Sequence, residues 1–251
     1  MKREFSGSCP KELQSPESNE DCYEFSTDGF RLALCDGASE SYNSRLWAEV
    51  LAKRFVANPK LTHEWLAEAQ IEYAKSHDFS AMSWSKQAAF ERGSFSTLIG
   101  VDFDPTSQQL SVTGIGDSIV FLTDSGRWVE SWPISNPEQF KEHPTLLSTL
   151  PIHNQLGSFE ATTEDYVRTY DLAGMKRPVL ICATDALGEW ALRHVLMDPF
   201  ALDRLRNLTS EQDFCALVNE ERQHKRMRLD DSTLIVLSFV SEENADALPV
   251  F

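Results

Sequence analysis

The chain has 251 residues, of which 41% are hydrophobic, enough for one sizeable core or at most two small ones, so we expect a single globular domain. Its 39 acidic and 23 basic residues give a formal net charge of −16, which argues against a nucleic-acid partner, because a phosphate backbone requires a basic face. No run approaches the ~20 apolar residues of a membrane helix, and the N-terminus lacks the apolar core of a signal peptide. The five cysteines show no CxxC spacing and are interpreted as reduced thiols. We therefore expect a cytoplasmic protein with no membrane partner.

The first part of the chain predicts a loose lead-in, a strand and three helices. Residues 1–18 are polar and carry Ser, Pro and Glu, which is typical of a loosely held segment. The apolar run GFRLALC at 29–35 predicts a strand. Apolar residues then recur at helical spacing and predict helices over 44–56, 63–77 and 83–92.

From residue 95 the pattern changes to short strands separated by turns. The segments FSTLIGVDFD, QQLSVTGIGD, SIVFLTD and RWVESW are typical of consecutive strands, and turn residues such as DPTS and DSG join them. Such a meander favours antiparallel pairing. The following segment, 133–168, is irregular and contains four prolines. A loop of this length is more often functional than not.

The C-terminal part predicts a strand, two helices and a final strand. RPVLICATDALGEWAL at 177–192 is an apolar strand that ends at an aspartate and continues as a helix. A long amphipathic helix is predicted over 210–226, with Ser210 placed to cap it. The last strand, STLIVLSFV, precedes a polar tail at 241–251. The basic run KRMR at 225–228 is interpreted as a solvated surface.

Several acidic residues share one feature: each lies at an end of a predicted apolar strand. They are Asp36, Asp117, Asp185 and Asp230-Asp231, with a further pair, Glu20-Asp21, ahead of the first strand. Each alone is more readily explained as a turn former, because Asp satisfies nearby backbone N–H groups. Neighbouring strand ends lie ~5 Å apart, however, so these carboxylates could meet at one sheet edge, where their repulsion would require a cation. Oxygen donors favour Mg²⁺ or Mn²⁺, whereas zinc and copper prefer His or Cys.

The order and approximate spacing of these motifs resemble the type-2C metal-dependent protein phosphatases, the PPM family, and most closely its bacterial, eukaryotic-like members. The resemblance covers residues 15–240 and rests on Asn19-Glu20-Asp21, Asp36-Gly37, GSFSTLIGV with VTGIGDS, ICATDALGEW and LDDSTLIVLSF. Each motif alone is weak, whereas five in the right order are specific. The resemblance implies an α+β fold, a four-layer α-β-β-α sandwich with two antiparallel sheets flanked by helices, in one domain over residues 1–240.

The resemblance also implies a dinuclear Mn²⁺ or Mg²⁺ centre. Asp36 would bridge the two ions, and the backbone carbonyl of Gly37 would hold one of them. Glu20 and Asp21 would reach the second ion, largely through water.

The resemblance places Asp185 and Asp230 in the shell of the first ion, where they would serve with Asp36 as the catalytic residues. Asp230 is preferred to Asp231 because it lies three residues before Thr233, where the family's Asp-x-x-Thr motif places its ligand. The choice between these two neighbours stays open.

Other positions resemble the family in part or depart from it. Asp117 and Glu189 resemble an optional third metal site. Most members carry a phosphate-binding arginine three residues before the first-motif Asn, and Pro16 stands there in this chain. The usual arginine after Gly-Asp-Ser is Ile119. Candidates to replace the missing phosphate contact are Lys11, Arg45 and Arg92.

The implied activity is hydrolysis of phosphoserine and phosphothreonine in a phosphorylated protein substrate. The irregular segment 133–168 falls where the family has its flap. Two alternatives stay open: a pseudophosphatase that binds a phosphorylated partner, and an interaction domain whose strand-end aspartates only form turns. The oligomeric state is not predicted.

Overall fold

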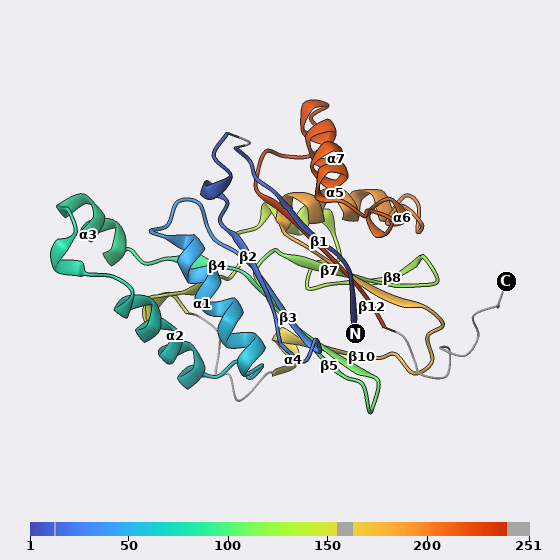
Figure 1. The fold of residues 1–251 in the computed structure, drawn as a ribbon, viewed down its shortest axis with the longest axis horizontal. Helices are drawn as coiled ribbons and strands as arrows, with labels where there is room; N and C mark the ends of the chain where they lie inside the picture. Colours follow the sequence, from blue (N-terminus) through green and yellow to red (C-terminus); the bar gives the residue numbers. More distant parts are fainter. Residues whose placement is uncertain (13, 155–162, 240–251) are drawn as a thin grey trace.

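The computed structural model describes residues 1–12, 14–154 and 163–239. Figure 1 shows two sheets packed face to face, with helices on the outer side of each. Every strand pair within these residues is antiparallel. The predicted α+β, four-layer sandwich is therefore confirmed.

The first sheet has five strands in the order β1-β12-β11-β7-β8. Their bounds are β1 (Lys2–Cys9), β12 (Ser232–Ser238), β11 (Pro178–Ala183), β7 (Ile119–Asp124) and β8 (Arg127–Trp132). The second sheet has five strands in the order β10-β6-β5-β3-β2. Their bounds are β10 (Val167–Asp171), β6 (Gln109–Ile115), β5 (Leu98–Asp104), β3 (Arg31–Asp36) and β2 (Asp21–Phe25). A separate two-stranded sheet pairs β4 (Phe95–Ser96) with β9 (Leu147–Ser148).

Two pairs of helices cover the outer faces of the sheets. Helices α1 (Ser44–Ala57) and α2 (His63–Lys75) pack on the second sheet, while α5 (Asp185–Val195) and α7 (Glu211–Gln223) pack on the first. Helix α3 (Trp84–Glu91) buries none of its residues and lies at one end of the molecule (Figure 1). The remaining short helices are α4 (Thr163–Tyr166), α6 (Asp203–Arg206), η1 (Pro16–Ser18), η2 (Phe79–Ala81), η3 (Pro137–Lys141) and η4 (Pro151–His153).

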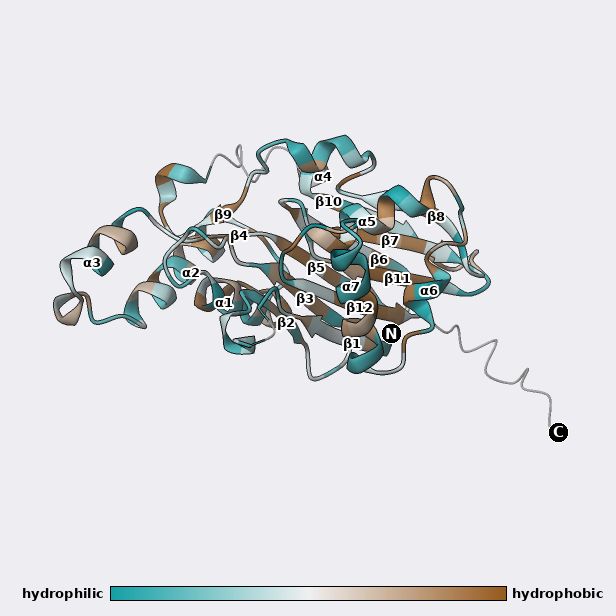
Figure 2. Cartoon of the chain, turned by 90° about the horizontal axis from the view of Figure 1, so that it is seen from above, coloured by the Kyte–Doolittle hydropathy of each residue, from teal (hydrophilic) through white to brown (hydrophobic). Residues whose placement is uncertain are grey.

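Apolar side chains fill three spaces, one between the sheets and one under each helical layer. Figure 2 shows that hydrophobic residues concentrate on the central strands. Strand β11 is buried at every position, because neighbouring layers cover both of its faces. This double burial explains why PVLICA is continuously apolar rather than alternating. In the second sheet, a Cβ at Gly100 would lie 2.2 Å from Cζ of Phe55, so this glycine lets α1 approach the strand closely.

The prediction that residues 1–18 form a loose lead-in is wrong for residues 2–9, which form strand β1. Strand β1 pairs with β12 from Lys2 opposite Ser238 to Cys9 opposite Ser232, with one irregularity near its start. Phe5 and Cys9 are buried in the core under α7. The alternation of the strand is hard to recognise in the sequence, because Gly7 occupies the inward position between them.

The helices predicted over 44–56, 63–77, 83–92 and 210–226 are confirmed as α1, α2, α3 and α7. Ser210 caps α7, since its Oγ accepts a hydrogen bond of 3.1 Å from the Asp213 N–H. Residues 133–168 include η3, β9, η4 and α4, whereas 155–162 lie outside the described residues. The predicted tail at 241–251 also lies outside them. Within the described part of the chain, none of the helices combines the length and apolar character needed to cross a membrane.

Candidate active site

The register of the first sheet places three aspartates at one end. Ala183, the last residue of β11, pairs with Ile119 at the start of β7 and with Leu234 near the start of β12. The segments just beyond these paired ends therefore lie side by side. They carry Asp117 ahead of β7, Asp230 ahead of β12, and Asp185 as the first residue of α5.

The second sheet contributes two further aspartates. Asp21 begins β2 and lies directly opposite Asp36, which ends β3. Asp36 lies close enough to the other four aspartates to interact with their charges. The negative charges of Asp21, Asp185, Asp117 and Asp230 each raise its pKa. The structure thus brings together five of the predicted carboxylates, which we call the carboxylate cluster: Asp21, Asp36, Asp117, Asp185 and Asp230.

Burial favours the protonated form of four members of the carboxylate cluster, Asp21, Asp36, Asp117 and Asp185. Burial raises the pKa of Asp36 well above its usual range, and the neighbouring negative charges add to this effect. Burial likewise raises the pKa of Asp21 to about 8 and that of Asp185 to about 7. The pKa of Asp117 is also raised, again chiefly by burial. A bound cation would relieve both effects.

Two threonine hydroxyl groups orient the carboxylate of Asp21. Oδ2 of Asp21 accepts hydrogen bonds from Oγ1 of Thr233 at 2.6 Å and Oγ1 of Thr184 at 3.1 Å. Its Oδ1 is buried and has no hydrogen-bond partner among the described residues. Such an orphaned carboxylate oxygen is expensive unless a cation or a proton satisfies it.

Asp36 is positioned by Thr97 of the GSFST motif. The Asp36 N–H donates to Oγ1 of Thr97 at 2.9 Å, and the Thr97 N–H donates to the Asp36 carbonyl at 2.9 Å. Oγ1 of Thr97 also bonds to Oγ of Ser118, the serine of Gly-Asp-Ser, at 2.8 Å. The GSFST and Gly-Asp-Ser motifs therefore hold the end of β3 against the start of β7.

Gly37 allows α1 to pack beside the carboxylate cluster. A Cβ at this position would lie 2.9 Å from the backbone of Ser44 at the start of α1. A larger residue would push the helix away, so the glycine has a packing role independent of any ion.

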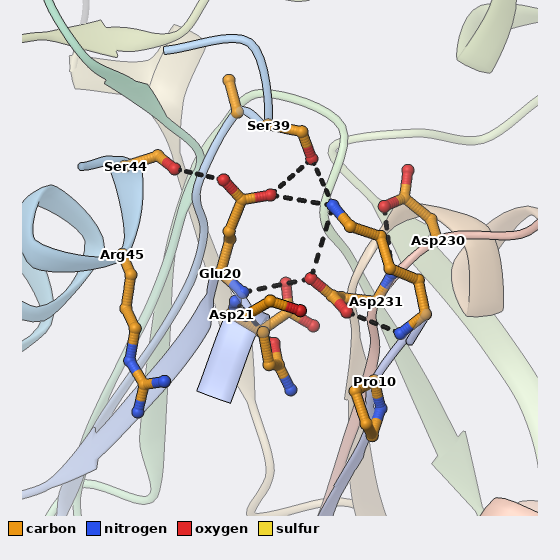
Figure 3. A network of polar contacts seen from close by, with 12 residues as sticks. Pro10, Glu20, Asp21, Ser39, Ser44, Arg45, Asp230 and Asp231 are labelled. Atoms are coloured by element: carbon orange, nitrogen blue, oxygen red, sulfur yellow. Dashed lines mark hydrogen bonds and ion pairs between the residues drawn. The ribbon is translucent and has the colours of Figure 1, made fainter. Parts of the chain in front are cut away.

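Adjacent residues Asp230 and Asp231 have different surroundings. Asp231 is buried, and its two oxygens accept from the backbone N–H groups of Lys11 at 2.7 Å and Glu20 at 3.0 Å (Figure 3). The Asp230 carboxylate accepts one described hydrogen bond, from the Asp231 N–H at 2.9 Å. Asp231 thus ties two chain segments together, while the carboxylate of Asp230 keeps oxygen lone pairs with which it could coordinate a cation.

Glu20 lies in a separate polar network. Its Oε2 accepts from Nζ of Lys11 at 2.8 Å and Oγ of Ser39 at 2.5 Å, and its Oε1 accepts from Oγ of Ser44 at 2.6 Å (Figure 3). Burial alone would raise the pKa of Glu20, but these hydrogen bonds hold it below its usual value. The structure therefore places Glu20 with Lys11, whose ammonium group is already engaged.

Arg228 is a site residue that the sequence interpretation missed. Its Nη2 forms an ion pair with Oδ2 of Asp185, and its Nε lies 4.0 Å from Oε2 of Glu189. Its charge also opposes the rise in the pKa of Asp117. The interpretation of KRMR as a solvated surface is thus corrected for Arg228. The signal available in the sequence was its position two residues before Asp230.

The arginines suggested as phosphate contacts are bound elsewhere. Nη1 of Arg45 donates to the Glu17 carbonyl at 2.9 Å, and its Nε lies 3.4 Å from Glu49. Arg92 donates to the Ala88 carbonyl at 3.1 Å. Arg228, in contrast, forms an ion pair with a carboxylate of the cluster.

The oxygen atoms of the carboxylate cluster are ligands of the kind that hard cations prefer, but they do not yet surround a single metal position. Over residues 1–12, 14–154 and 163–239, no three His, Cys, Asp or Glu side chains are already arranged around one metal position. The carboxylate cluster nevertheless supplies only oxygen donors, including the unpartnered Oδ1 of Asp21. Such donors fit Mg²⁺ or Mn²⁺.

No protein-family model matches the chain, and a search of curated proteins found no match. Solved structures do match. The photosystem II phosphatase PBCP is 14% identical with a TM-score of 0.56, covering 94% of this chain and 98% of its own. Stp1, a serine/threonine phosphatase from Staphylococcus aureus, is 13% identical with a TM-score of 0.56, covering 94% of each chain. The Mycobacterium tuberculosis serine/threonine phosphatase PstP/Ppp is 13% identical with a TM-score of 0.53, covering 95% of this chain and 98% of its own. The similarity extends over nearly the whole length of both partners, and the chain therefore has the fold of the PPM-type protein phosphatases.

Proposed function

We propose that this protein is a metal-dependent phosphatase that hydrolyses phosphoserine and phosphothreonine in protein substrates. One observation carries the proposal: both sheets of a phosphatase fold direct their strand-end aspartates to one place, where burial raises the pKa of several of them. A purely structural role would leave this repulsion uncompensated. The pairing of Arg228 with Asp185 relieves part of it.

The proposed metal ligands are Asp36, the Gly37 carbonyl, Asp185 and Asp230, with Asp21 close to the second ion. Asp230 is supported over Asp231 because both oxygens of Asp231 already accept backbone hydrogen bonds. Two Mn²⁺ or Mg²⁺ ions, when bound, would activate water as a nucleophile and stabilise negative charge on the phosphoryl group.

The chain's own residues would hold these ligands in place. Thr97 fixes the backbone of Asp36 through two hydrogen bonds, and Thr184 and Thr233 donate to the carboxylate of Asp21. This support positions the end of β3 and orients the Asp21 carboxylate before any substrate arrives. Direct attack by water requires no covalent intermediate, so the products would be inorganic phosphate and a free hydroxyl group.

Glu20 and the pair Asp117 and Glu189 lie among side chains that already interact with them, so their proposed roles are more restricted. Glu20 would act on the site only through Lys11 and water, since both of its oxygens accept hydrogen bonds from other side chains. A third ion at Asp117 and Glu189 would have to compete with Arg228, which lies near both carboxylates.

The test is hydrolysis of p-nitrophenyl phosphate and of a phosphothreonine peptide, with and without Mn²⁺. We expect turnover only with the metal. Asp36→Asn and Asp185→Asn should each lower kcat by orders of magnitude, because each removes a ligand charge while keeping the side chain's shape. Glu91→Gln, an exposed carboxylate change on α3, is the matched control and should retain full activity.

Calorimetric titration with Mn²⁺ separates the alternatives. Uptake of about two ions without any turnover would indicate a pseudophosphatase, for which Pro16 in place of the phosphate-binding arginine is the supporting feature. No uptake at all would leave the aspartates as turn formers and refute the phosphatase.

A further inference from the structure

A groove with strongly basic walls lies next to the carboxylate cluster. Its volume is about 730 Å³, and it is formed by α5 and by the connection from α7 to β12. Glu189 is the one acidic residue among those that line it. The basic residues that line this groove are Arg193, Arg222, Lys225, Arg226 and Arg228.

Three of these cations are matched by carboxylates. Arg193 pairs with Glu189 at 2.7 Å, Arg226 pairs with the buried Glu221 at 2.7 Å, and Arg228 pairs with Asp185. Arg228 lines the groove and pairs with Asp185 of the carboxylate cluster, so the groove adjoins the proposed reaction site.

Arg222 carries a positive charge without a described carboxylate partner. Its guanidinium donates to the carbonyls of Pro10 at 2.9 Å and Cys9 at 3.2 Å, to the Asp230 carbonyl, and to Oγ of Ser232 at 3.1 Å. These acceptors are neutral, so they fix the group without cancelling its charge. Arg222 is a rigid cation in the groove wall.

Lys225 is the second uncompensated cation. It is exposed, lies two residues after the end of α7, and adopts a left-handed backbone with φ of 56°. Its Nζ forms no ion pair with any carboxylate in the described part of the chain. The groove thus has two more positive charges than its described partners neutralise, on a chain whose formal net charge is −16.

We propose that this basic groove binds acidic residues that flank the phosphorylated residue of the protein substrate. The inference rests on the proposed function and deepens it, because it names the sequence class that the site would select. A phosphate at the carboxylate cluster would lie beside Arg228, and the adjoining substrate residues would extend along the groove towards Arg222 and Lys225. Acidic side chains there would pair with Lys225 and be attracted by the uncompensated charge of Arg222, whose guanidinium stays bonded to the protein. Nucleic acid, the other polyanion, is disfavoured by the acidic charge of the rest of the chain.

The first experiment measures binding and does not depend on turnover. A fluorescent peptide with Glu on both sides of an unphosphorylated Thr is titrated with wild-type protein, and a peptide with Ala in place of Glu is the comparison. We expect tighter binding of the acidic peptide, weakened about 3- to 10-fold by Lys225→Glu, because reversing one exposed charge acts through a partly screened interaction. Rising salt should weaken it further.

Lys86→Glu is the matched control, since Lys86 is exposed on α3, far from the groove, and the substitution changes the net charge equally. It should leave the preference for the acidic peptide unchanged. Equal weakening by Lys86→Glu and Lys225→Glu would attribute the preference to overall charge and overturn the proposal. Equal binding of both peptides by wild-type protein would also overturn it.

The second experiment compares kcat/KM for phosphothreonine peptides with the same acidic and neutral flanks. We expect a higher value for the acidic peptide and a ratio reduced about 3- to 10-fold by Lys225→Glu. Hydrolysis of both peptides at equal rates would overturn the groove's role and leave the phosphatase intact. Binding that depends on Lys225 without hydrolysis of either peptide would support the groove and refute the phosphatase.

Discussion

Asp230 and Asp231 show how two adjacent carboxylates can take separate roles. Asp231 accepts the N–H groups of Lys11 and Glu20, so it joins the segment after β1 to the segment before β2. The carboxylate of Asp230 accepts one described hydrogen bond, from the N–H of its neighbour. We infer a structural role for Asp231 and a ligand role for Asp230.

Substitution of each residue distinguishes these roles. Asp231→Ala leaves two partly buried N–H groups without acceptors and should lower the free energy of unfolding by about 1–3 kcal/mol. Asp230→Asn should leave that free energy nearly unchanged and abolish Mn²⁺-dependent turnover. Urea unfolding and p-nitrophenyl phosphate hydrolysis measure the two effects. A stable Asp231→Ala variant without activity, beside an active Asp230→Asn variant, would reverse the assignment.

The raised pKa of Asp21 predicts how the stability of the metal-free protein depends on pH. Its pKa of about 8 in the folded chain lies above the ordinary value near 3.9, so the folded state binds more protons between these values. The free energy of unfolding should therefore fall as pH rises from about 4 to about 8, with a slope of up to about 1.4 kcal/mol per pH unit from this residue. Thermal unfolding with a chelator present measures this slope.

Asp21→Asn should flatten this dependence, because the amide does not titrate. The variant should therefore be more stable than wild type at pH 8 and gain little at pH 4. Added Mn²⁺ should stabilise the wild type most at pH 8, where the carboxylates would otherwise carry uncompensated charge. Parallel stability curves for wild type and Asp21→Asn would contradict the pKa shift.

At the scale of elements, Gly188 determines how closely α5 approaches β7. A Cβ at this position would lie 2.3 Å from Cγ2 of Ile119. Helix propensity alone predicts that Gly188→Ala stabilises the protein by about 1 kcal/mol. The close contact predicts the opposite, a loss of about 1–3 kcal/mol, with lower activity because α5 carries Asp185 at its first turn.

A double variant tests the cause of this effect. Ile119→Ala removes the clashing methyl group, so the combined loss with Gly188→Ala should be smaller than the sum of the two single losses. Urea unfolding of the four proteins gives the coupling energy. A stabilised Gly188→Ala variant would show that the helix shifts without cost.

Elements differ in how clearly the sequence indicates them. Strand β11 was recognisable because both of its faces are buried and its residues are continuously apolar. Strand β1 was missed because its inward positions alternate with serines and include Gly7, which contributes little hydrophobic signal. Strand β10, buried only at Tyr170 among its five positions, showed no alternation either. A strand whose stability comes from its neighbours leaves a weak local pattern.

At the scale of the whole molecule, β1 couples the N-terminus to the candidate site. The strand covers β12 along its length, and Phe5 packs against Phe214 of α7 with ring centroids 5.8 Å apart. The carbonyl of Cys9 also accepts from Arg222 in the wall of the groove. Removing this strand would expose β12 as an edge and release that arginine.

Deletion of residues 1–9 should therefore prevent stable folding. We expect aggregation on expression, or loss of the cooperative thermal transition measured by circular dichroism. This outcome would be unexpected for a loosely held segment. A truncated protein that melts within a few degrees of the full chain would show that β1 contributes little.

Sequence alone determined the type of fold, the order of most elements and the acidic residues worth testing, because apolar periodicity and motif order are local properties of the chain. Tertiary structure decided which of those residues meet. The register of β11 with β7 and β12 gathers Asp117, Asp185 and Asp230, whereas Glu20, next to Asp21 in the chain, turns to Lys11. Arg228 joined the site for the same reason: contacts between residues distant in the chain depend on strand register and helix packing, which no local pattern encodes.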